Sequence, residues 1–183
     1  MKNPEGWARL EARAQWTLEH PDQISPLDTL QGRALVLRLW RHRRSGPRVS
    51  WGLFVPEGDD NRALVREATW NEAADLRRMS SRRVALKRRP AEEPSVRVRD
   101  AVVGRATLVP FLRHAAEVLP VGAVRDGEPG PAGAEFGIEG FRALSCIRFV
   151  WTGKGPDDYR NAAAWTDRLR ALLEASLRER ETA

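Results

Sequence analysis

Two stretches of alternating apolar and polar positions lie close together in the first third of the chain, at residues 34–41 and 49–55. In the first stretch, leucine recurs at every second position from Leu35, and in the second, apolar residues do so from Val49. A period of two with β-branched and aromatic residues is typical of strands. Because a Ser-Gly-Pro sequence at 45–47 separates the two runs, we predict an antiparallel hairpin.

The residues after this hairpin predict a third strand, a short helix and a further strand. Residues 63–70 alternate again, with Leu64 and Trp70 on one face, and residues 72–79 are rich in good helix formers. A single helix over both stretches is the competing interpretation, because Ala, Leu, Glu and Arg occur in both. We prefer a three-stranded meander followed by a short helix, and then a strand at 96–103.

Helical periodicity is clearest in the C-terminal half. Apolar residues from Leu108 to Leu119 recur at spacings of three and four, which predicts an amphipathic helix. Residues 135–141 and 143–151 predict a second hairpin, whose second strand is apolar on both faces. The last helix is expected to begin near residues 155–158 and to face inward with Ala162, Trp165, Leu169, Leu172, Leu173 and Leu177.

The first 20 residues leave two interpretations open. Asn3, Pro4 and Glu5 are typical of a helix start, and the apolar spacing is helical as far as Ala14. From Ala14 the pattern alternates, which also permits a strand before Pro21. Residues 21–32 read as a loop.

This order of elements predicts one α+β domain over residues 1–183. We expect a mainly antiparallel sheet of about five to seven strands, with two or three helices packed on one face. Half of the 14 residues at 120–133 are Gly or Pro, so a flexible loop is predicted there. The charged tail at 178–183 is expected to fray.

Charge is unevenly distributed along the chain. The net charge is +6, but residues 33–99 alone carry 17 Lys and Arg against 8 Asp and Glu, a surplus of 9 positive charges. Such asymmetry favours an anionic partner for the middle of the chain. Codon bias is the alternative explanation of the arginine content: 28 of the 31 basic residues are arginine, which a GC-rich coding sequence would also produce.

Catalytic and metal-binding motifs are missing from the sequence. It contains no glycine-rich phosphate loop, HExxH, paired CxxC or GxSxG motif, and its three histidines, His20, His42 and His114, lie in different predicted elements. One cysteine with scattered histidines is a poor ligand set for zinc. We therefore predict no metal, no cofactor and no enzymatic activity.

Three arrangements of reactive groups remain as weaker alternatives. Cys146 with His114 would form a nucleophile and base if the fold joined them, but Cys146 fits better as a buried apolar residue. Glu135 and Glu139 lie about 13 Å apart on one strand, too far for a paired-carboxylate site, and are expected on a solvated face. An enzymatic site near 120–133 would have no motif behind it.

Arginines and tryptophans together give the candidate binding surface. Trp40, Trp51 and Trp70 would lie near one another across the meander, where aromatic rings beside Arg can stack on bases. Core packing explains Trp51 and Trp70, and equally Trp151 and Trp165, while both interpretations stay open for Trp40. The predicted binding residues are Arg38, Trp40, Arg41, Arg43, Arg44, Arg48, Arg77, Arg78, Arg82, Arg83, Lys87, Arg88 and Arg89.

The C-terminal third offers one general likeness. Its Asp126-Gly127 turn, the strands ending in Trp151 and the helix carrying Trp165 are similar to small uncharacterised bacterial proteins, some of which accompany toxins as neutralising partners. We expect a non-enzymatic bacterial protein–protein interaction module, of neutralising (immunity) type or a regulatory partner, that binds an acidic protein. The alternative is a nucleic-acid-binding domain that uses the hairpin tip and the basic run at 77–89.

The sequence also gives an expectation for the cellular location. One cysteine permits no disulfide within the chain, no secretory signal is visible, and no stretch of about 18 apolar residues occurs. A cytoplasmic protein without a membrane partner is therefore expected. The sequence predicts no oligomeric state.

Overall fold

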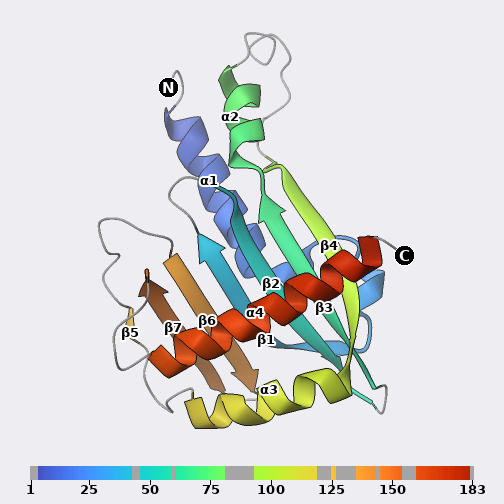
Figure 1. Cartoon of the computed structure of the whole chain (residues 1–183). Helices are drawn as coiled ribbons and strands as arrows, with labels where there is room; N and C mark the ends of the chain where they lie inside the picture. Colours follow the sequence, from blue (N-terminus) through green and yellow to red (C-terminus); the bar gives the residue numbers. More distant parts are fainter. Residues whose placement is uncertain are drawn as a thin grey trace.

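One seven-stranded sheet forms the centre of the computed structural model, which describes residues 4–42, 46–58, 61–80, 93–118, 125–126, 135–142, 145–153 and 160–181 (Figure 1). The strands are β1 (Arg33–His42), β2 (Arg48–Pro56), β3 (Arg62–Trp70), β4 (Val96–Gly104), β5 (Arg125–Asp126), β6 (Glu135–Arg142) and β7 (Ser145–Thr152). Their order is β4-β3-β2-β1-β6-β7-β5. All neighbours are antiparallel except β5 and β7, which pair in parallel. The predicted α+β class and mainly antiparallel sheet are confirmed.

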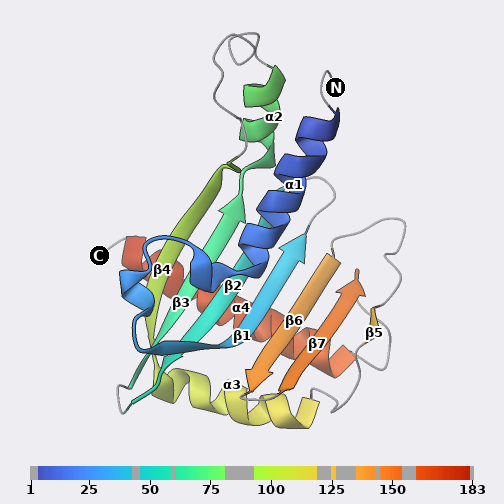
Figure 2. The ribbon, with the colours of Figure 1, turned by 180° about the vertical axis from the view of Figure 1, so that it is seen from behind.

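Helices cover both faces of this sheet. They are α1 (Pro4–Glu19), α2 (Glu72–Ser80), α3 (Arg105–Val118) and α4 (Arg160–Glu181), with short 3-10 turns η1 (Pro21–Gln23) and η2 (Asp28–Leu30). Figure 1 shows α3 and α4 in front of the sheet, and Figure 2 shows α1 crossing its opposite face. The prediction of two or three helices on one face was wrong, because the described part of the chain has four α-helices: α3 and α4 lie on one face, α1 lies on the other, and α2 extends beyond the end of β3.

The second layer has a physical reason in the central strands. β2 and β3 are buried along most of their length on both faces, so each face needs a cover. The α4 side packs the inward stripe of α4, including Leu169 and Leu173, against Trp51 and Leu53, and burying each such side chain contributes about 1.5–3 kcal/mol. The opposite side packs Leu18 of α1 with Trp70.

Several local predictions are confirmed and two alternatives are wrong. The hairpin forms with Leu39 opposite Trp51. A register irregularity between Leu35 and Leu37 interrupts the alternation, so Leu37 and Leu39 share the face of Leu53 while Leu35 lies opposite Phe54. Residues 62–70 form a strand rather than the start of α2. α1 remains helical to Glu19, so the strand alternative after Ala14 is wrong. Ala14 and Leu18, which are four residues apart, are both buried on one side of the helix.

Some predictions fall outside the described residues. The Gly/Pro-rich segment at 120–133 is described only at Arg125 and Asp126, in β5, and the predicted start of the last helix at 155–158 is not described. At the C-terminus, α4 extends to Glu181, and Arg180 donates a hydrogen bond to the backbone oxygen of Asp100. Residues 182–183 lie outside the described part.

Trp40 of β1 lies directly over the backbone of β6, where only glycine fits. Gly137 is opposite Trp40 in the register, and a β-carbon at Gly137 would lie 1.9 Å from Cζ2 of that indole ring. The ring cannot move aside freely, because Trp40 is 6% exposed and the guanidinium groups of Arg38 and Arg148 lie 5.0 and 5.3 Å from its centre. Gly137 therefore fixes the spacing between the two hairpins.

We predict that Gly137→Ala lowers the free energy of unfolding by about 1–3 kcal/mol, because the added methyl group displaces a packed indole. Gly140→Ala on the same strand is the matched control, since its β-carbon would meet Leu37 at an ordinary 3.9 Å. The control should change stability by about 0.5 kcal/mol or less. Urea unfolding followed by circular dichroism measures both, and equal effects of the two variants would contradict this account.

Candidate functional site

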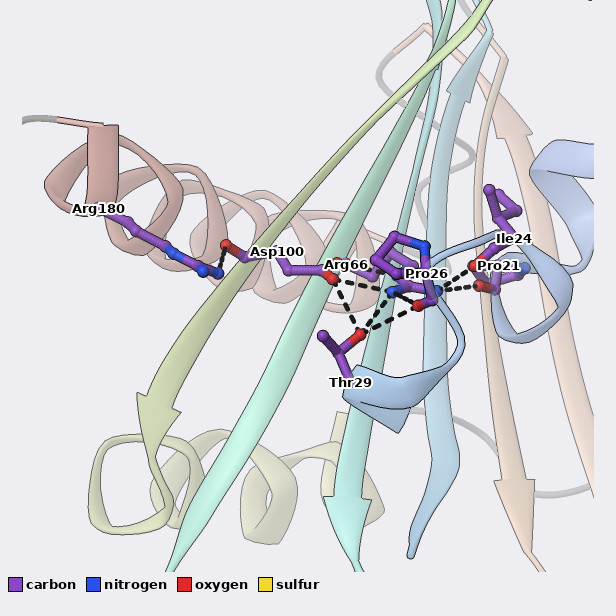
Figure 3. A network of polar contacts seen from close by, with 7 residues as sticks. All are labelled: Pro21, Ile24, Pro26, Thr29, Arg66, Asp100 and Arg180. Atoms are coloured by element: carbon purple, nitrogen blue, oxygen red, sulfur yellow. Dashed lines mark hydrogen bonds and ion pairs between the residues drawn. The ribbon is translucent and has the colours of Figure 1, made fainter. Parts of the chain in front are cut away.

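The α1 face of the sheet holds a buried charge network centred on Arg66. Arg66 is fully buried and binds both carboxylate oxygens of Asp100 at 2.8 Å. Its remaining hydrogen bonds go to the segment between α1 and β1 (Figure 3), with acceptors on Pro21, Ile24, Pro26 and Thr29. Arg66 therefore fastens this segment to the sheet.

Arg38 is also an interior group. Its guanidinium forms an ion pair with Glu139 and donates to the backbone oxygen of Glu19, and the residue is 5% exposed. Burial lowers the pKa of Arg38, while the charges of Glu139 and Glu19 oppose that shift. Glu139 was expected on a solvated face; this is wrong, because its side chain is 13% exposed and carries the countercharge of Arg38.

The other described binding residues contact groups within the chain. Arg48 pairs with Glu11 and lies over Trp70, whereas Arg41 lies on the α4 face over Trp51. On α2, Arg77 is exposed and Arg78 pairs with Asp75. The remaining predicted residues lie outside the described part of the chain: Arg43, Arg44, Arg82, Arg83, Lys87, Arg88 and Arg89.

The candidate stacking tryptophans are core residues. Trp40, Trp51 and Trp70 are 6%, 1% and 0% exposed. Their indole nitrogens donate to carboxylates: Trp40 to Glu135, Trp51 to Glu67 and Trp70 to Asp75. The core interpretation of Trp51, Trp70, Trp151 and Trp165 is confirmed, and none of the three meander tryptophans offers an open ring face for a base.

A groove of about 600 Å³ lies at the end of the sheet where β3 meets α2. Its apolar part is formed by Pro47, Ala73 and Leu76, of which Pro47 and Ala73 are exposed. The polar lining includes Arg97, an exposed residue near the start of β4. Gly46, Thr69, Trp70, Asn71 and Glu72 complete the lining. We call this feature the strand-end groove.

Both predicted basic runs are joined to the sheet at this same end. His42 is opposite Arg48, which is opposite Trp70, so the β1–β2 connection and the end of β3 lie in one register row. The segment 43–45 begins and ends at this row, and the segment 81–92 begins at α2 and ends just before β4. Sequence reasoning missed the groove because the ends of four separate elements form it.

Asp75 fixes the orientation of α2 and hence one wall of the groove. The carboxylate is fully buried and accepts from the indole of Trp70 at 2.8 Å, from both the backbone and the hydroxyl of Ser95, and from Arg78 at 2.7 Å. Burial alone would raise the pKa of Asp75, yet the hydrogen bonds of Ser95 and Trp70 and the charge of Arg78 hold it below its ordinary value. Asn71 begins the helix by accepting from the backbone of Ala74.

We predict that Asp75→Asn destabilises the protein by about 1–3 kcal/mol at pH 7, because an amide cannot accept all of these hydrogen bonds. A depressed carboxyl pKa stabilises the fold above the ordinary pKa near 4, and this stabilisation is lost as the pH falls through the lower folded value. The difference between wild type and variant should therefore shrink below about pH 4.

The matched control for Asp75 is Asp167→Asn. Asp167 also pairs with an arginine three residues later, at 3.0 Å, but its side chain is 62% exposed. Its replacement should cost about 0.5 kcal/mol or less in urea unfolding. A cost at Asp75 no larger than that at Asp167 would show that the buried carboxylate does not hold α2.

His42, at the end of β1, is the one described histidine with a strongly shifted pKa. Burial, followed by the charge of Arg48, lowers the pKa of His42 to about 4. The charge of Glu19 opposes this shift, and Arg38 and Arg148 add smaller effects that lower the pKa. Nδ1 lies 3.6 Å from the carboxylate of Glu135, and the buried Nε2 has no hydrogen-bond partner in the described structure. His42 is therefore neutral at pH 7.

We predict that the free energy of unfolding falls by about 2 kcal/mol between pH 7 and pH 5 through this group. The folded pKa lies below the unfolded value near 6.5, so the unfolded chain takes up the proton first and stability is lost as the pH falls. His42→Gln should remove most of this dependence, whereas His114→Gln, whose side chain is 44% exposed, should retain it. Identical pH profiles for all three proteins in urea unfolding would contradict the assignment.

The reactive groups singled out in the sequence are only partly covered by the described residues. No three His, Cys, Asp or Glu side chains among them are grouped as metal ligands. His114 lies on α3 and contacts Glu117 at 2.9 Å; the side chain of its candidate partner Cys146 is outside the described part. None of the described helices combines the length and the apolar character required to cross a membrane.

Comparisons with known proteins return no relative. The chain matches no protein-family model, no curated protein and no solved structure. The function must therefore be argued from the residues of this chain alone.

Proposed function

We propose that the protein is a non-catalytic binding protein whose acidic protein partner approaches the end of the sheet that carries the strand-end groove. A neutralising or regulatory partner protein is the class of interaction module that fits such a surface. The single cysteine favours a cytoplasmic location for it.

The observation that carries the proposal is the attachment of both basic runs to one end of the sheet. The five basic residues at 82–89, with Arg43 and Arg44, belong to segments whose described neighbours flank the groove. By contrast, the described arginines in the interior pair with carboxylates of the chain. Clustered positive charge accelerates encounter with an acidic partner and selects it over others.

Two features favour a protein partner over nucleic acid. Proteins that bind single strands stack bases on accessible aromatic rings, and Trp40, Trp51 and Trp70 are buried. The groove also has apolar walls at Pro47 and Leu76, which suit a side chain better than a phosphate backbone.

The proposal is tested with two labelled probes, poly-L-glutamate and an oligothymidylate of about 20 nucleotides, by fluorescence anisotropy at low and high salt. We expect wild type to bind polyglutamate more tightly than oligothymidylate. Replacing the run residues Arg82, Arg83, Lys87, Arg88 and Arg89 by glutamine should weaken polyglutamate binding about tenfold.

The control variant removes the same charge from elsewhere on the surface. It replaces five exposed arginines by glutamine: Arg9, Arg13, Arg105, Arg113 and Arg168. This variant should bind polyglutamate within about threefold of wild type. Equal losses in both variants would reduce the interaction to net charge, and tighter, steeply salt-dependent binding of oligothymidylate would replace the proposal by nucleic-acid binding.

A further inference from the structure

The strand-end groove is large enough to accommodate a side chain of a partner protein and has apolar walls that suit one. Its 600 Å³ exceeds the volume of one large side chain, and the helix and strand elements that form it are held by buried contacts. Pro47 stands on one rim, and Ala73 and Leu76 of α2 form another wall. An apolar side chain placed among them would be removed from water on several sides.

The charges beside the groove favour carboxylates next to that side chain. Thr69 and Arg97 of the lining lie on the α4 face, the face that also carries Arg41. Glu67 on that face is 7% exposed and is bound by Arg99 and Trp51, so its charge is largely withdrawn from the surface. Glu72 is the one acidic residue among the described residues that line the groove.

We infer that the strand-end groove binds an extended acidic segment of the partner protein, with one apolar side chain of that segment inserted between Pro47 and Leu76. This inference rests on the proposed function and specifies which part of the partner is recognised. Burial of the apolar side chain makes the binding selective. The carboxylates on either side of it are attracted to Arg97.

Two labelled peptides separate the inference from the proposed function. One has alternating Asp and Glu around a single central leucine, and the other has serine in place of that leucine. We expect wild type to bind the leucine peptide about tenfold more tightly at about 50 mM salt, because burying one large aliphatic side chain has an effect of this size.

The variant that tests the groove is Ala73→Gln, which places a longer neutral side chain against the groove without changing the charge. Ala73 is exposed, so the substitution leaves the core intact. Ala171→Gln, at an exposed position in α4, is the matched control. Ala73→Gln should bind both peptides with equal affinity, whereas Ala171→Gln should keep the preference for leucine.

Each other result overturns a defined part of the argument. Equal affinity of wild type for both peptides, or a preserved preference in Ala73→Gln, overturns the groove as the docking site and leaves the proposed function standing. No binding of either peptide overturns both. Sedimentation of wild type as a dimer that Ala73→Gln dissociates would assign the groove to a second copy of this chain and overturn the acidic partner segment.

Discussion

The interior of this fold depends on the neutralisation of a fully buried guanidinium group. Arg66 lies at 0% exposure in the middle of β3, where an unpaired charge would be strongly unfavourable. The bidentate contact with Asp100 of β4 cancels the charge, and oxygen atoms from residues 21–29 accept its other hydrogen bonds. The irregular segment after α1 therefore stabilises the sheet, because it supplies the acceptors that the buried Arg66 needs.

The same principle extends across the sheet in one register row. Asp100 and Arg66 are followed on β1, β6 and β7 by Arg38, Glu139 and Arg148, so positive and negative groups lie as neighbours. Between them, β2 contributes Gly52, whose missing side chain leaves room: a β-carbon there would lie 3.1 Å from Pro21. Because partners in such a row come from different strands, the charges bind only when the register is correct, and this favours one arrangement of the sheet.

The sequence predicts the elements of this fold better than their environment. Alternation is a local signal, so the two hairpins and the amphipathic α4 follow directly from it. The face of β1 with Arg38 and Trp40 resembles a solvated face, because nothing local indicates that α1 returns to cover it. Glu139 was misassigned for the same reason, since its partner lies about 100 positions earlier in the chain. Burial of a charged residue is set by nonlocal pairing, which residue patterns do not encode.

Nonlocal pairing also decides which basic residues are neutralised within the protein. Arg38, Arg66 and Arg99 bind carboxylates inside the protein, so a count of arginines along the sequence overstates the charge available at the surface. An arginine-rich composition from coding bias would leave the surplus scattered. Here seven of the 31 basic residues belong to the segments 43–45 and 81–92, whose described flanking residues lie at the end of the sheet that carries the groove. In the proposed function, the place where charge is attached to the fold, rather than its total amount, selects the partner.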